Sequence, residues 1–196
     1  MLNYFRFLSY FARFTYDYDT RYIINATVRA DGSSRFGEEN RYGVFPSASA
    51  GWVISNESFL KDSKKVSLLK LRASYGLTGN AGIGNFDYKG LYGIGAYAGT
   101  SAIYPSTIAN PSLTWEKTAQ FDIGFDFGFH NDRITGEIDY YIKNTTDLLL
   151  DVPVPATTGY AVQTQNIGSL ENKGFEFVLN TDNFVGNFSW STSFNF

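Results

Sequence analysis

A strict alternation of apolar and polar side chains runs through residues 118–129 and limits what this segment can form. One set consists of Ala119, Phe121, Ile123, Phe125, Phe127 and Phe129. The other set consists of Thr118, Gln120, Asp122, Gly124, Asp126 and Gly128. Successive side chains of a β-strand point to opposite faces, so a strand separates the two sets, whereas a helix of 3.6 residues per turn would mix them. The segment is predicted to be a strand with one apolar and one polar face.

The same alternation recurs along the chain. Eight segments are predicted to be strands, at residues 9–18, 22–31, 42–54, 66–78, 115–129, 133–148, 168–181 and 187–196. Strands of soluble sheets usually have about five or six residues, and several of these segments are longer. A tilted strand needs ~9–11 residues to cross the hydrocarbon of a membrane. The lengths favour an antiparallel, up-and-down transmembrane β-barrel, with the apolar set outside and Gln120, Asp122 and Asp126 pointing inward.

The predicted connections alternate between shorter and longer segments. Those near 17–21, 130–132 and 182–186 are short and the one near 55–65 is of medium length, whereas the alternate ones lie near 32–41, 79–114 and 149–167, the middle one being much longer. Because antiparallel strands alternate in direction, all the long connections fall on one rim of the sheet. Barrels of bacterial outer membranes have this asymmetry, with short periplasmic turns and long extracellular loops. A soluble β-sandwich has no reason to sort its loops in this way.

Composition supports an all-β chain and removes several classes of function. Aromatic residues make up 18% and Gly numbers 19, which is typical of strands and turns. There is no Cys, so disulfides, thiolate metal sites and a cysteine nucleophile are excluded. The net charge of −3 gives no basic surface for nucleic acid. The first residues lack the pattern of a signal peptide, so we expect the natural N-terminus to lie upstream.

Several strings resemble the SusC/RagA family of TonB-linked outer-membrane transporters. They are DGSSRFG (31–37), FPS (45–47), GW (51–52), LKLRASYG (69–76), TGN (78–80), NPSLTWE (110–116), TTDLL (145–149) and NIG (166–168). They occur in one order from about residue 9 to the end. The chain is therefore identified as resembling a C-terminal barrel segment of this family.

The resemblance implies a 22-stranded barrel with a plugged lumen, to which residues 1–196 contribute about eight strands as a partial barrel domain. It implies uptake of oligosaccharides or peptides through the outer membrane of a Gram-negative bacterium. The implied partners are outer-membrane lipid, a SusD-like surface lipoprotein, and the TonB complex through an N-terminal region that this sequence lacks, along with the plug domain. No cofactor, metal site or enzymatic activity is expected.

The long connection 79–114 holds the candidate substrate-binding residues. They are the aromatic residues Phe86, Tyr88, Tyr92, Tyr97 and Tyr104, spread among Gly, Ala and Ser. Such rings suit stacking on sugar or peptide ligands, and the alternative is that they pack on neighbouring loops. The Gly-rich run 79–85 lacks the spacing of a phosphate-binding loop and is interpreted as a flexible extracellular loop. His130 is interpreted as a polar turn residue.

A set of charged residues is predicted on the inward face: Arg13, Arg29, Arg72, Asp122, Asp126, Glu137 and Asp139. We expect these groups to bind neighbouring strands or a plug rather than to act as acid and base. Two other functions are consistent with the strands alone. One is a soluble β-sandwich that binds glycans, and the other is a closed eight-stranded pore, which requires residues 9–18 to pair with 187–196. The favoured fragment predicts instead a curved sheet with unpaired first and last strands.

Overall fold

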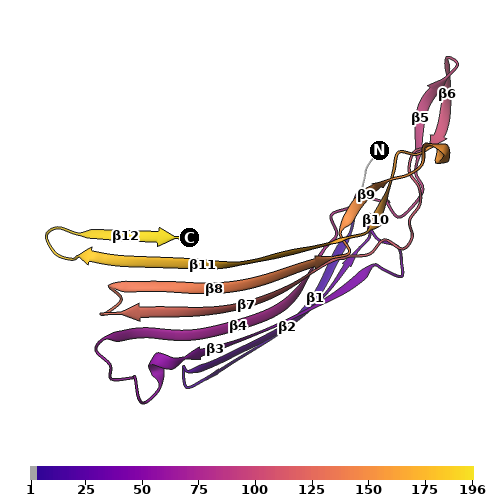
Figure 1. Cartoon of the computed structure of the whole chain (residues 1–196). Coiled ribbons are helices and arrows are strands. Elements are labelled where there is room, and N and C mark those ends of the chain that lie inside the picture. The colour runs from indigo at the N-terminus through magenta and orange to yellow at the C-terminus, as the bar shows by residue number, and fades with distance from the viewer. Residues whose placement is uncertain (1–3) are drawn as a thin grey trace.

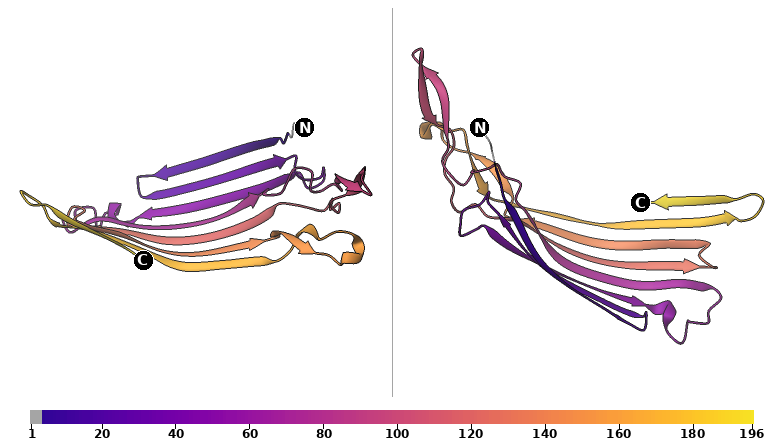
Figure 2. Two further views of the ribbon diagram at one scale, coloured as in Figure 1. Left: turned by 90° about the horizontal axis from the view of Figure 1, so that it is seen from above. Right: turned by 180° about the vertical axis from the view of Figure 1, so that it is seen from behind.

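The computed structural model describes residues 4–196 as one curved antiparallel sheet with two small hairpins. The strands of the large sheet follow the order β1-β2-β3-β4-β7-β8-β11-β12 (Figures 1 and 2). Their bounds are β1 (Phe7–Tyr18), β2 (Tyr22–Ser33), β3 (Tyr42–Val53), β4 (Val66–Asn80), β7 (Glu116–Phe129), β8 (Ile134–Thr146), β11 (Ser169–Phe184) and β12 (Trp190–Asn195). Each strand pairs with the strands before and after it in this order, so the predicted all-β, up-and-down fold is confirmed.

The boundaries differ from the predicted ones mainly at the last turn. β11 continues to Phe184, and β12 begins only at Trp190. Their register shifts between Asp182 and Phe184, which interrupts the regular alternation there. A bulge inserts an extra residue into one strand, so the period-two pattern loses its phase at this point.

Two of the long connections contain strands that the sequence did not indicate. One connection forms the hairpin of β5 (Tyr92–Tyr97) and β6 (Thr100–Pro105), and the other forms the pair β9 (Leu149–Pro153) and β10 (Val162–Asn166). The β5–β6 turn consists of Ala98 and Gly99, both at positive φ, which gives a two-residue turn suited to a twisted hairpin. Two short 3₁₀ helices complete the chain, η1 (Ile54–Asn56) and η2 (Ala156–Thr158).

No helix among residues 4–196 is long and apolar enough to cross a membrane.

The two longest connections leave the same end of the sheet, as predicted, but the sorting by length is incomplete, because residues 54–65 at the other end form a longer connection than residues 34–41. The loop rim comprises residues 34–41, 81–115 and 147–168, and the turn rim comprises residues 19–21, 54–65, 130–133 and 185–189. Figure 1 shows the β5–β6 and β9–β10 hairpins together at the loop rim, far from the turn between β11 and β12.

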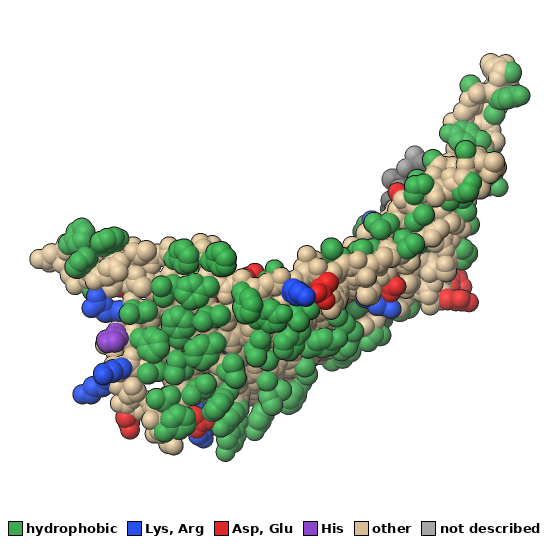
Figure 3. All heavy atoms as spheres, viewed as in Figure 1, with side chains coloured by type: hydrophobic (Ala, Val, Ile, Leu, Met, Phe, Trp, Pro, Cys, Tyr) green, Lys and Arg blue, Asp and Glu red, His purple; other side chains and the backbone are tan. Residues whose placement is uncertain are grey.

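The two faces of the large sheet differ in chemistry. On the apolar face, Phe121 pairs with Tyr75 on β4 and with Ile142 on β8. Many of its side chains remain exposed, including Tyr10 at 63% and Phe175 at 68%. Figure 3 shows apolar side chains covering the strands between the two rims. The predicted separation of the 118–129 side chains into an apolar and a polar set is confirmed.

Neither edge of the large sheet is closed within residues 4–196. β1 pairs with β2, β12 pairs with β11, and the two edge strands do not pair with each other. The closed eight-stranded pore is therefore wrong for this structure. The soluble sandwich is also wrong, because within the described chain no second large sheet packs on the first.

A small buried core lies at the loop rim. Its residues are Phe36, Phe45, Ile83, Leu113 and Trp115. Trp115 joins the loop segments, since its ring contacts Phe36 and Phe45 and its Nε1 donates to the carbonyl of Arg41 at 3.2 Å. Burial of Ile83 corrects the interpretation of residues 79–85 as a flexible loop, because the run begins in β4 and then packs into this core.

The asparagines of the recognised strings tie the loop rim together. The Nδ2 group of Asn166 donates to the carbonyls of Thr114 at 2.8 Å and Asp147 at 3.0 Å, and its Oδ1 accepts from the Thr114 amide at 2.9 Å. Asn110 donates to the carbonyl of Thr164 at 2.8 Å. These side chains supply backbone partners where the chain leaves the sheet, which explains why asparagine stands at these positions.

Candidate functional site

The polar face carries a group of linked charges near the middle of the large sheet. We call it the Arg72 cluster; its members are Lys70 and Arg72 on β4, Asp122 and Asp126 on β7, and Glu137 and Asp139 on β8. Four carboxylates therefore meet two cations, and all but the Glu137 side chain are largely shielded from solvent.

Arg72 is the centre of this cluster. Its Nε donates to Asp126 at 2.9 Å and its Nη2 donates to Asp139 at 2.7 Å. The longer contacts are 3.4 Å to Asp122 and 3.5 Å to Glu137. Charge-assisted bonds from one guanidinium thus connect three strands. The prediction that these carboxylates bind neighbouring strands is confirmed for the described part of the chain.

Gly124 makes this arrangement possible. In the strand register Arg72 pairs with Gly124, and Gly124 pairs with Asp139, so the glycine lies directly between the ion-pair partners. A Cβ at Gly124 would come within 2.2 Å of Asp139 Oδ1 and 2.5 Å of Arg72 Cζ. The missing side chain leaves the space in which the guanidinium crosses β7.

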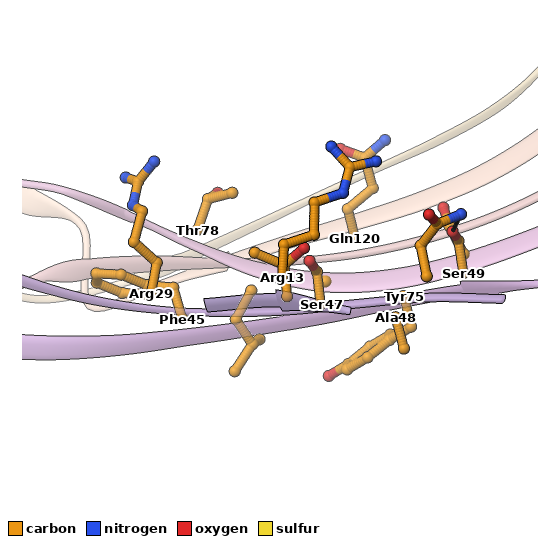
Figure 4. A pocket seen from close by; sticks show the side chains of 14 residues that line it. Arg13, Arg29, Phe45, Ser47, Ala48, Ser49, Tyr75, Thr78 and Gln120 are labelled. Atoms are coloured by element: carbon orange, nitrogen blue, oxygen red, sulfur yellow. Dashed lines mark hydrogen bonds between the residues drawn. The ribbon is translucent and has the colours of Figure 1, made fainter. Parts of the chain in front are cut away.

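Closer to the loop rim, the polar face is hollowed by a cavity of about 520 Å³, which we call the Arg13 hollow (Figure 4). Its lining residues are Arg13, Asn25, Thr27, Arg29, Phe45, Ser47, Ala48, Ser49, Ser74, Tyr75, Gly76, Leu77, Thr78 and Gln120. Figure 4 shows Arg13, Arg29 and Gln120 projecting to the same side of the sheet, opposite to Tyr75.

The two arginines of the hollow differ in their partners. Arg29 forms an ion pair with Asp31, whose side chain is fully buried, through Nε at 2.7 Å and Nη2 at 2.6 Å. The Arg13 guanidinium has no ion pair or hydrogen bond within residues 4–196. The hollow therefore presents one neutralised and one available cation.

The structure divides the predicted loop aromatics into two groups. Phe86 and Tyr88 both lie beside Lys89, whose Nζ is 5.9 Å and 5.4 Å from their ring centroids. Tyr88 also packs against the buried loop-rim core. Tyr88 therefore packs on a neighbouring segment, as the alternative interpretation of the loop aromatics predicted. Phe86 remains 41% exposed.

The other three aromatics belong to the β5–β6 hairpin. Tyr92 and Tyr97 are 72% and 79% exposed. Tyr104 pairs with Gly93 in the register, and its ring lies over Gly93 and Gly95. The hairpin thus presents the exposed rings of Tyr92 and Tyr97, while the Tyr104 ring packs on the opposite strand of the same hairpin. Binding of cargo by the five aromatics stays a prediction.

A clamp at the turn rim was not indicated by any sequence pattern. The Glu57 carboxylate accepts from Tyr22 Oη at 2.7 Å, Trp52 Nε1 at 3.0 Å and Arg21 Nη1 at 3.0 Å. The hydrogen bonds from Tyr22 and Trp52, with the Arg21 charge, lower the pKa of Glu57 below its usual range. The same pairing raises the pKa of Arg21. Arg21 and Glu57 lie in two different connections, while Tyr22 begins β2 and Trp52 lies near the end of β3, so only folding brings the four residues together.

His130, the single histidine of the chain, lies in a turn. His130 is exposed in the β7–β8 turn at a positive φ of 56°, where its amide donates to the carbonyl of Lys65. This placement agrees with its interpretation as a turn residue. Among residues 4–196 no group of three His, Asp or Glu side chains is arranged to hold a metal ion.

Comparison with known proteins agrees with this architecture. The sequence model of the family described as "TonB dependent receptor-like, beta-barrel" matches residues 3–196. The TonB-dependent receptor SusC of Bacteroides thetaiotaomicron is 46% identical over 198 residues, which covers 96% of this chain and 20% of that protein. TonB-dependent receptor P39 of Formosa agariphila is 44% identical over 190 residues, covering 96% of this chain and 18% of that protein.

A solved structure extends the comparison to three dimensions. The structure of the RagAB peptide transporter contains a chain with 38% sequence identity and a TM-score of 0.91, matching 97% of this chain and 21% of that chain. The chain therefore spans about a fifth of the length of the proteins that it matches.

Proposed function

Because the chain belongs to the TonB-dependent receptor-like β-barrel family, we propose that it forms part of the wall of a SusC/RagA-type nutrient transporter in the outer membrane of a Gram-negative bacterium. The observation that carries this proposal is the single curved sheet with an exposed apolar face and a charged polar face. In a closed barrel the apolar face meets lipid and the polar face meets the lumen.

The cargo is an oligosaccharide or a peptide. Support for a peptide comes from the matched structure of a peptide transporter, and the oligosaccharide is what the resemblance to the SusC/RagA family implies. The polar face offers hydrogen-bonding and charged groups along the lumen rather than reacting groups, which suits passage of a polar solute. Tyr92 and Tyr97 lie on the exposed hairpin at the loop rim. They would contact a SusD-like lipoprotein, or the cargo before the cargo enters the barrel.

The remaining parts of the transport cycle lie in other segments of the complete protein. A plug domain would gate the barrel, and an N-terminal region would contact the TonB complex. This chain would supply the lipid-facing and lumen-facing wall and part of the loop rim.

Cysteine scanning of the complete transporter in lipid vesicles tests the wall assignment. The chain contains no Cys, so single cysteines can be introduced at residues 119–127 after replacing any cysteines elsewhere in the transporter. We expect bimane fluorophores at 121, 123 and 125 to be quenched by brominated lipid, and those at 120, 122 and 126 to be quenched by aqueous iodide. Equal quenching at both sets by one reagent would contradict the proposal.

Loss of uptake tests the transport part separately. A strain lacking the transporter gene should fail to grow on one class of oligosaccharide or peptide, and the wild-type gene should restore growth. Normal growth of the deletion strain on all such nutrients would argue against a role in uptake.

A further inference from the structure

We propose that the Arg13 hollow binds a carboxylate of the cargo, so that the transporter selects acidic oligosaccharides or acidic peptides. The inference rests on the proposed function and specifies the cargo by one chemical group. It starts from the guanidinium of Arg13 on the polar face, which has no partner among residues 4–196.

The charge of the hollow is the first argument. Its lining contains two arginines and, within the described chain, no Asp or Glu. Arg29 is neutralised by buried Asp31, whereas Arg13 has all of its donors available within residues 4–196. A guanidinium offers parallel N–H groups that match the two oxygens of a carboxylate. The hollow therefore has the cation that an acidic ligand needs.

The neighbouring side chains provide further bonds for a polar ligand. Thr27, Ser47, Thr78 and Gln120 line the hollow and make no side-chain hydrogen bonds within residues 4–196. Their hydroxyl and amide groups both donate and accept, so they suit sugar hydroxyls or peptide amides. A cavity of about 520 Å³ falls in the range of small-molecule sites, which is large enough for a few sugar or amino-acid units.

The surrounding charges favour binding of an acidic ligand in the hollow rather than elsewhere on the polar face. Along β7, Gln120 lines the hollow, and Asp122, the nearest β7 member of the Arg72 cluster, lies two residues further toward the turn rim, about 7 Å away at 3.3–3.4 Å per strand residue. The cluster has four carboxylates and two cations, so it repels a carboxylate that the hollow attracts. An acidic cargo would be held on the loop-rim side of the wall, where it enters.

Matched ligand pairs bound to the complete transporter test this proposal. The probes are trigalacturonate against galactotriose and, in a second arm, a tetrapeptide with central Glu residues against its Gln counterpart, both amidated at the C-terminus. Isothermal titration calorimetry in detergent should give at least tenfold tighter binding to the acidic member of one pair. A preference within the sugar pair identifies the cargo as an acidic oligosaccharide, and a preference within the peptide pair identifies it as an acidic peptide. The preference should shrink as salt is raised, because exposed charges are screened.

Variants of Arg13 assign the preference to the hollow. Arg13→Gln should reduce the preference to less than threefold, and Arg13→Lys should retain a substantial part of it. Lys61→Gln is the matched control, since it removes one exposed cation from the turn rim, away from the hollow. Heat-modifiable mobility on gels checks that each variant is folded.

Different failures have different meanings. If wild type binds both members of each pair equally, the carboxylate proposal is overturned and the transport function stands. If Arg13→Gln lowers the melting temperature of the empty transporter but keeps the preference, Arg13 pairs with a carboxylate inside the protein, and the cargo assignment is wrong. If none of the four probes binds and uptake is also absent, both proposals fail.

Discussion

Arg72 reaches Asp139 across an intervening strand, with 2.7 Å between Nη2 and Oδ2. The contact joins β4 to β8 over Gly124 of β7, so one guanidinium fixes the lateral alignment of three strands. Stability of the wall should therefore depend on this residue more than on any exposed ion pair.

Removal of Arg72 should destabilise the complete transporter strongly. In Arg72→Gln the Asp139 side chain stays largely buried and loses its cation, which costs about 3 kcal/mol for a shielded pair. The matched control is Lys117→Gln, because the Lys117–Asp147 pair is exposed and 4.0 Å long, and such pairs are worth about 0–1 kcal/mol. Urea unfolding in lipid measures both; equal losses would contradict the central role of Arg72.

A methyl group at Gly124 should disturb the same crossing. Gly124→Ala places a Cβ where the Asp139 carboxylate and the Arg72 guanidinium now lie, and overpacking of this kind costs about 1–3 kcal/mol. Gly51→Ala on the same face is the control, since its nearest neighbour would be 3.6 Å away. The two variants are compared by their unfolding midpoints, and an unchanged Gly124→Ala midpoint would refute the steric argument.

The two faces should respond differently to a new charge. Phe125→Arg should cost ~2–4 kcal/mol if the position lies near the bilayer midplane, because a cation on the lipid face loses its hydration. Gln120→Arg places the charge on the polar face and should cost much less. A lipid-folding titration of the complete transporter measures both, and similar costs would argue against the lipid-facing assignment of the apolar side.

The Glu57 clamp should make the turn rim sensitive to acid. Because the folded pKa of Glu57 is lowered, the clamp contributes stability above the unfolded value of about 4.5 and loses it as pH falls through the lower folded pKa. Trp52 donates directly to Glu57, so Trp52 fluorescence should change in that acidic range. Glu57→Gln should abolish this transition; a transition that persists in the variant must come from another group.

The loop aromatics should separate into structural and exposed residues. Tyr88→Ala removes a ring packed on the loop-rim core and should lower stability by about 1–2 kcal/mol. Tyr97→Ala removes a ring that is 79% exposed, so stability should stay within ~0.5 kcal/mol while affinity for the cargo falls severalfold. Thermal unfolding and calorimetry measure the two effects. Unchanged affinity in Tyr97→Ala would remove that ring from the predicted binding set.

Much of the fold was predictable because its determinants are local. Period-two alternation needs only neighbouring residues, so it located the eight strands of the large sheet and assigned Gln120 and Phe121 to opposite faces. The β5–β6 hairpin escaped prediction because its strands have only six residues each, β5 is interrupted by Gly93 and Gly95, and its Ala98-Gly99 turn lacks the usual Asn-Gly or Asp-Gly signature. Strands β9 and β10 also escaped prediction, because they have only five residues each and such short segments show little periodicity.

The sequence by itself determined the strand chemistry: which side chains share a face, which connections are long, and which family the strings resemble. Only the tertiary structure decided which charges meet. Arg72 pairs with residues 50 to 67 positions away in the chain, and Arg13 is left without a partner within the described residues. The physical reason is register: each contact depends on how far one strand is shifted against the next, and that shift is set by hydrogen bonds and packing across the whole sheet.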